Sequence, residues 1–160
     1  MIKHLICGVL VWLSLAVCSA ASNESSIKKE AFTLLGQGTQ SGIAIQRFEI
    51  IRNEAAFQSI WQAHALVGSQ PLNQPTVNFQ TTMVIAAFAG TKPTSGYRIE
   101  ITGISKQGQG ENLEVTLMLT EPGPECFVSE VMTQPYVMMK TAMSSQSVHF
   151  TLMTKTSKCG

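Results

Sequence analysis

The sequence predicts an α+β fold, in which a mostly antiparallel sheet of about six or seven strands, or an incomplete β-sandwich, is covered by one helix. Three observations support this prediction. Several segments alternate apolar and polar residues with the period of a half-buried strand, glycine and proline clusters separate them, and a single stretch has apolar residues at helical spacing. The chain of 160 residues is the size of one domain.

Residues 1–21 are expected to be a signal peptide rather than part of the fold. Lys3 supplies a positive charge, residues 5–17 form an apolar run too short to span a bilayer comfortably, and the small residues that follow fit cleavage after Ala20 or Ala21. Two alternatives remain open, a retained membrane anchor and lipoprotein processing that attaches lipid to Cys18. In all three cases the protein is expected to be exported. Its predicted location is the periplasm or the medium, or, for a lipoprotein, the membrane to which Cys18 anchors it.

The first half of the mature chain predicts strands on either side of one helix. Residues 22–40 are expected to form an N-terminal tail and a first short strand, and residues 41–160 the domain. A strand is predicted at 43–52, and Asn53 can cap the helix that follows, with the negative charge of Glu54 favourable in its first turn. Apolar and aromatic residues at helical spacing mark the buried face: Phe57, Ile60, Trp61 and His64, the last read as a packed histidine.

The remaining segments predict strands. Residues 82–89 are almost all apolar, as in a central strand covered on both faces. Residues 97–104 and 113–119 alternate apolar and polar side chains, with Tyr97 on the apolar face of its strand. Residues 136–143 and 148–153 are expected to form a C-terminal hairpin.

Two cysteines remain once the signal peptide is removed together with Cys18. An exported protein permits disulfides, so Cys126 and Cys159 are expected to form one, with two buried free thiols as the alternative. A metal site is disfavoured, because two sulfurs need further ligands and the mature chain offers only His64 and His149.

The charged residues argue against several function classes. Eleven basic and ten acidic residues nearly cancel, and no basic run suggests nucleic-acid binding. The chain contains no aspartate and no G-x-S-x-G elbow, which removes the Ser-His-Asp triad and the paired aspartates of acid proteases. The methionines near the C-terminus are read as core filler rather than copper ligands. We therefore expect no enzyme, no metal and no cofactor.

The segment from Lys92 to Gly96 predicts a rigid, exposed loop. Pro93 fixes one backbone angle and Gly96 permits a positive φ, so Lys92, Thr94 and Ser95 can be presented to a partner with little loss of entropy. The alternative is a hairpin turn that only sets the register of the next strand.

Short motifs recur in a fixed order over about 120 residues from Ser41 onwards. They are the strand and helix of 51–64, Asn78-Phe79 before the apolar strand 83–88, Gly90 to Tyr97, Glu121 to Cys126, and Gln134 to Tyr136. This ordered set resembles the C-terminal domain of PrcB-type protease-complex subunits, although the family often has an acidic residue where Asn78 stands. The resemblance implies an exported accessory domain that associates with a peptidase and has no catalysis of its own.

A second resemblance favours inhibition. Lys92 to Tyr97 is similar to the Asn-Pro-Thr-Thr-Gly-aromatic loop of chagasin-type cysteine peptidase inhibitors, and Gln134 to Tyr136 to their Arg-Pro-Trp loop. Those inhibitors insert three loops from one end of a β-sandwich into the active-site cleft of the peptidase. In an antiparallel meander, the turn at 108–110 falls at the end of the sandwich opposite to the Lys92 loop, so it cannot be one of the three loops. Tyr136 lies at the same end as Lys92 only if residues 127–133 form a loop rather than a strand.

The sequence thus predicts a non-catalytic protein-binding domain, an accessory or stabilising subunit of a peptidase or other envelope protein. A chagasin-like inhibitor and a binding module unrelated to peptidases are the alternatives. Tyr136 is expected to be an anchor for the partner. The predicted partner-binding residues are Lys92, Pro93, Thr94, Ser95, Gly96, Gln134, Pro135 and Tyr136.

Overall fold

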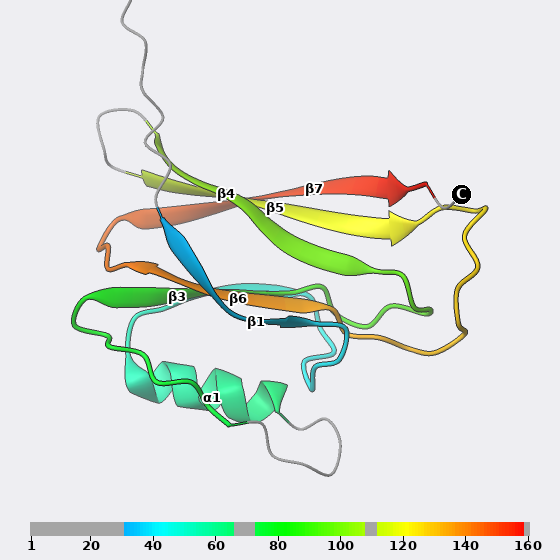
Figure 1. Cartoon of the computed structure of the whole chain (residues 1–160). Helices are drawn as coiled ribbons and strands as arrows, with labels where there is room; N and C mark the ends of the chain where they lie inside the picture. The colour runs from blue at the N-terminus through cyan, green and yellow to red at the C-terminus, as the bar shows by residue number, and fades with distance from the viewer. Residues whose placement is uncertain (1–30, 66–72, 108–111, 159–160) are drawn as a thin grey trace, which may run out of the picture.

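The computed structural model describes residues 31–65, 73–107 and 112–158 (Figure 1). The expected signal peptide, Cys18, the turn at 108–110 and Cys159 lie outside these residues. The elements are β1 (Phe32–Gly38), β2 (Arg47–Ile51), α1 (Glu54–His64), β3 (Thr82–Phe88), β4 (Arg98–Gln107), β5 (Asn112–Pro122), β6 (Tyr136–Ala142) and β7 (Ser147–Ser157).

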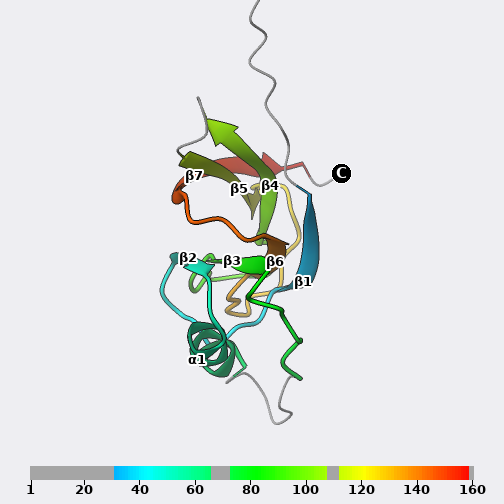
Figure 2. The ribbon, with the colours of Figure 1, turned by 90° about the vertical axis from the view of Figure 1, so that its left-hand side faces the viewer.

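The elements form three layers, which confirms the predicted α+β class. A three-stranded sheet of order β4-β5-β7 packs on a four-stranded sheet of order β1-β6-β3-β2, and α1 covers the other face of the larger sheet (Figures 1 and 2). Four strand pairings are antiparallel, as expected, and the pairing of β5 with β7 is parallel. Among the described helices, none has the length and apolar character needed to cross a bilayer.

The helix begins and packs where the sequence predicts. Asn53 has an extended backbone, and its side chain accepts a hydrogen bond of 2.8 Å from the amide of Ala56, which satisfies one free donor of the first turn. Phe57, Trp61 and His64 are buried against the sheet. Burial of this apolar face stabilises a helix that is short for independent stability in water.

Strand β3 is buried on both faces, as its almost unbroken apolar sequence predicts. Met83, Ile85 and Ala87 belong to the core between the two sheets. Val84, Ala86 and Phe88 alternate with them and belong to the core beneath α1, to which Met138 of β6 also contributes. The central strand therefore joins two apolar cores.

The predicted hairpin of 136–143 with 148–153 is wrong, because β6 and β7 lie in different sheets. Arg52, at the end of β2, donates hydrogen bonds of 2.8 Å to the carbonyl oxygens of Ser144 and Gln146. These bonds tie the connection between β6 and β7 to the residue that follows β2. Since the chain also crosses between the sheets after β5, β7 returns parallel to β5 (Figure 1).

The first strand, β1, lies within the predicted range of 22–40. It runs through Gly36 and Gly38, over which the ring of Tyr136 lies; a Cβ added to Gly38 would stand 2.9 Å from that ring. β2 is shorter than predicted, because residues 43–46 leave the sheet where Gly90, at a φ of 72°, packs against the backbone of Gln46.

Candidate functional site

Two segments far apart in sequence meet at one end of the sandwich and form a surface that we call the rim, residues 91–97 and 123–136. Lys92 and Thr133 form an isolated antiparallel bridge, in which each amide donates to the other's carbonyl oxygen at 2.8 and 3.0 Å. In Figure 1 the yellow-to-orange segment after β5 descends from the upper sheet to the lower one beside the green loop before β4. Residues 127–133 contain no strand, which is the condition stated above for the Tyr136 loop to lie at the same end of the sandwich as the Lys92 loop.

Further hydrogen bonds fix the two segments to each other. The amide of Ser95 donates to the carbonyl oxygen of Ser129 at 3.0 Å, and the amide of Ser129 donates to the Ser95 hydroxyl at 2.8 Å. The hydroxyl of Thr133 donates to the carbonyl oxygen of Thr94 at 2.9 Å. The Ser95 hydroxyl therefore has a structural partner, which reduces its availability to a second protein.

The backbone of the first segment has the turn chemistry that the sequence predicts. Gly96 adopts a φ of 90°, which other residues rarely adopt, and a Cβ there would meet Pro122 at 3.1 Å and Val128 at 3.2 Å. Pro93 and Gly96 are exposed, whereas Lys92, Thr94 and Ser95 are half-buried. The Lys92 ammonium lies 5.6 Å from the centre of the Tyr97 ring, within the range of a cation–π interaction.

Tyr97 lies at the rim rather than in the core. Its predicted strand begins one residue later, at Arg98, and Tyr97 is half-buried beneath Lys92. The parity of this strand correctly places Ile99 and Ile101 in the core between the sheets.

The second predicted loop is fixed to neighbouring strands. The amide of Gln134 donates to the carbonyl oxygen of Thr39 at 2.9 Å, and the carbonyl oxygen of Pro135 accepts from the amide of Ala89 at 2.8 Å. Gln134 is half-buried and Pro135 is buried. Pro135 therefore positions the loop and offers little of its own surface to a partner.

Tyr136 points towards the layer of α1. Its ring centre lies 4.1 Å from that of His64, and the ring stacks on Phe88 at 6.5 Å. It is half-buried, and this burial raises the pKa of the phenol. The contacts give Tyr136 a structural role in addition to the partner contact predicted for it.

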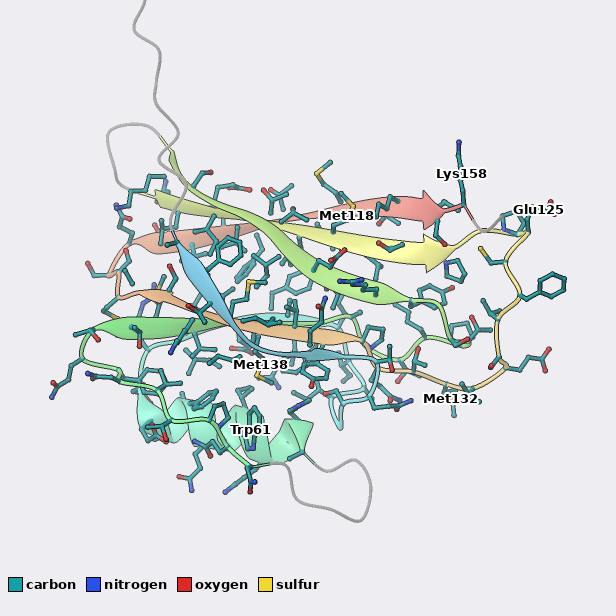
Figure 3. All side chains as sticks on the ribbon, viewed as in Figure 1. Trp61, Met118, Glu125, Met132, Met138 and Lys158 are labelled. Atoms are coloured by element: carbon teal, nitrogen blue, oxygen red, sulfur yellow. The ribbon has the colours of Figure 1, made fainter. Side chains whose placement is uncertain are left out.

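Three apolar side chains of the rim are exposed. Phe127 and Val131 were missed by the sequence reasoning, and the reading of Met132 as core filler is wrong. Phe127 is 107% exposed relative to its reference state, Val131 52% and Met132 69%. Figure 3 shows Glu125 and Met132 on this loop, at the right-hand end of the sandwich. The sequence did contain a signal for these exposed side chains. Residues 127–132 are rich in apolar side chains but follow neither helical nor strand periodicity, and they lie between two proline-containing turns.

One histidine lies beside a serine inside the fold, and metal-binding side chains do not cluster in the described ranges. No group of three metal-binding side chains occurs among them. His64 Nδ1 lies 3.0 Å from the Ser41 hydroxyl, but His64 is fully buried and Ser41 is 2% exposed, so a substrate cannot reach the pair. His64 Nε2 is buried without a partner, and burial lowers the pKa of the imidazole.

Cys126 lies beside the end of β7. Its Sγ is 3.8 Å from the carbonyl oxygen and 3.7 Å from the hydroxyl of Ser157. Because Cys159 is outside the described residues, the Cys126–Cys159 disulfide stays a prediction.

Comparison with known families matches residues 83–142 to the PrcB C-terminal family. The match runs from β3 to β6 and contains both segments of the rim. It confirms the predicted resemblance over this range, which is narrower than the range from Ser41 onwards that the motifs suggested. No curated protein and no solved structure matches the chain, and none of the comparisons supports the chagasin-like resemblance.

Proposed function

From the match of residues 83–142 to the PrcB C-terminal family, we propose that the protein is an exported, non-catalytic protein-binding domain. It acts as an accessory or stabilising subunit of a peptidase, or of another envelope protein. The rim is the surface that contacts this partner.

One observation carries the proposal: the rim combines a fixed backbone with exposed apolar side chains. The bridge between Lys92 and Thr133 and the bonds between Ser95 and Ser129 restrict both segments before any partner arrives. A surface ordered in advance loses less entropy on binding. Phe127 adds an exposed aromatic ring, the side-chain type that often dominates binding energy.

The charges at the rim suggest what the partner presents. Glu125 and Glu130 are exposed and lie two and three residues from Phe127 in the sequence, and the segment 123–135 contains no basic residue. A partner with an apolar pocket bordered by basic side chains would complement this segment, with Lys92 at its margin.

The expected disulfide belongs to the same proposal. A Cys126–Cys159 bond would tie the end of β7 to the segment that carries Phe127. The position of Cys126 Sγ next to Ser157, two residues before Cys159, supports this pairing. Export is required for the bond to form and persist.

The test is site-specific photo-crosslinking in the cell that produces the protein. A photoreactive phenylalanine replaces Phe127, and a matched control replaces Leu34, an apolar residue of β1 that is 52% exposed. We expect one protein adduct at position 127 that is absent at position 34 and weaker after Met132→Ser. The same adducts at both positions, or none at 127, would contradict the proposal.

Identification of the adduct by mass spectrometry then separates the alternatives. A peptidase that keeps its activity in the complex identifies an accessory subunit, and a peptidase that loses it identifies an inhibitor. A partner other than a peptidase or envelope protein identifies an unrelated binding module.

A further inference from the structure

Strand β7 is a long edge of the three-stranded sheet. Its inner side pairs with β5 from Ser147 to Ser157 without any shift in register. In the described part of the chain, no strand pairs with its other side. Such an edge presents a row of backbone donors and acceptors that can pair with a further strand.

The other three sheet edges are each protected. β1 and β4 carry irregularities in their pairing register, and the Gln37 side chain of β1 donates to the carbonyl oxygen of Ile99 on β4 at 3.0 Å. β2 is only five residues long and carries an ion pair between Arg47 and Glu49 at 2.6 Å. Bulges, short length and charge are devices by which proteins avoid edge pairing. β7 has neither a bulge nor a proline, carries a single lysine, and is more than twice as long as β2.

The apolar core is open beside this edge. Val148, Phe150 and Leu152 face the core between the sheets but are only half-buried, whereas the corresponding residues of β5 are buried. The Phe150 ring lies 5.6 Å from that of Phe48 on β2. Figure 2 shows the labels of β7 and β2 on the same side of the two sheets. A strand added to β7 would extend this core.

We propose that the added strand is β7 of a second copy of the protein, paired antiparallel about a two-fold axis at Leu152. This register gives the longest overlap, and it places Phe150 opposite Thr154 and Thr151 opposite Met153. Directly opposed residues then lie on the same face of the sheet, so the apolar side chains of both copies meet over the open core. The pairing of Phe150 with Thr154 joins an aromatic to a β-branched side chain, a favourable combination across strands.

The charges of β7 fit this register. Lys155 is its only basic residue apart from the histidine, and the register keeps the Lys155 side chains of the two copies apart. Lys155 of one copy lies opposite His149 of the other, whose neighbour on β5 is Glu114. The negative charge of Glu114 thus lies one strand beyond the residue that faces Lys155.

The dimer has a consequence for the rim, although the proposal does not depend on the function of the rim. Because the two copies of β7 run antiparallel, the two rims lie at opposite ends of the joined sheet. Both remain free to bind, and a dimer can engage two partner molecules.

The test measures the mass of the mature protein by light scattering and sedimentation across a dilution series. The wild type should approach twice the monomer mass. Thr151→Lys with Met153→Lys places lysine opposite lysine twice and should raise the dissociation constant at least about tenfold. Thr151→Lys with Met153→Glu places lysine opposite glutamate and should keep the dimer. Thr102→Lys, on the exposed face of β4, is the matched control and should also keep it.

Thermal unfolding of each variant establishes that it is folded. A wild-type protein that remains monomeric at every concentration overturns the proposal. It is equally overturned if the two double variants are folded and dimerise alike.

Discussion

Replacement of Tyr136 by alanine should reduce stability more than its position at the rim suggests. The ring lies 4.1 Å from that of His64, stacks on Phe88 and covers Gly36 and Gly38 of β1. Its removal therefore opens the edge of the core beneath α1. The helix and β1 both lose a contact.

The magnitude follows from the burial of the ring. Complete loss of a fully buried aromatic side chain costs about 3–5 kcal/mol, and a half-buried ring should cost about 2–3 kcal/mol. For a domain of this size, each kcal/mol corresponds to a shift of about 3–5 °C in the thermal midpoint, so the midpoint should fall by roughly 6–15 °C. Tyr136→Phe keeps the ring and should change the midpoint by far less.

Urea and thermal unfolding of Tyr136→Ala, Tyr136→Phe and Phe127→Ala provide the measurement. Phe127 is fully exposed, so its alanine variant should unfold like the wild type while losing partner binding. If Tyr136→Ala unfolds at the wild-type midpoint, the ring is not part of the core and the reasoning is wrong.

Three further predictions concern stability and covalent structure. The contribution of His64 to the free energy of unfolding should be fully present above about pH 6.5 and should be lost as the pH falls below that value. The reason is that burial lowers the pKa of His64, so the unfolded chain binds the proton more readily than the folded protein. His64→Gln should flatten this part of a pH series of urea unfolding curves. Gly90→Ala should cost at least about 1–2 kcal/mol, since Gly90 has a φ of 72° and a Cβ would stand 2.7 Å from the Gln46 amide nitrogen; an unchanged denaturation midpoint would contradict this. Peptide mapping without reductant should find Cys126 joined to Cys159, a bond worth roughly 3–4 kcal/mol in the chain-entropy model, whereas free labelling of both thiols would exclude it.

The sequence was sufficient to predict the fold class because local patterns determine most of its elements. The Asn53 cap, the helical spacing of Phe57 and Trp61, and the apolar run of β3 each depend on neighbouring residues alone. The partition into two sheets was not predictable in this way. β6 and β7 lie in different sheets, and the segment between them makes contacts that are distant in sequence: Arg52 donates to the carbonyl oxygen of Ser144 from a position 92 residues earlier in the chain.

Those features of the rim that depend on neighbouring residues were predicted, and those that depend on distant residues were not. Turn chemistry at Pro93 and Gly96 is local and was read correctly, whereas the direction of Tyr136 depends on His64 and on two glycines of β1. Strand parity could not indicate this, because Tyr136 is the first residue of β6 and both sides of that strand face protein.

The internal bonds of the rim narrow the choice of residues that can contact a partner. The Ser95 hydroxyl accepts from Ser129, so Ser95→Ala would loosen the junction of the two segments, and reduced binding by that variant would not show direct contact. The exposed apolar side chains, by contrast, are not buried against any other part of the described structure. The proposed function therefore predicts a loss of affinity without a loss of stability for substitutions of Phe127 and Met132. For Ser95 it predicts a loss of affinity together with a change in the junction of the two segments.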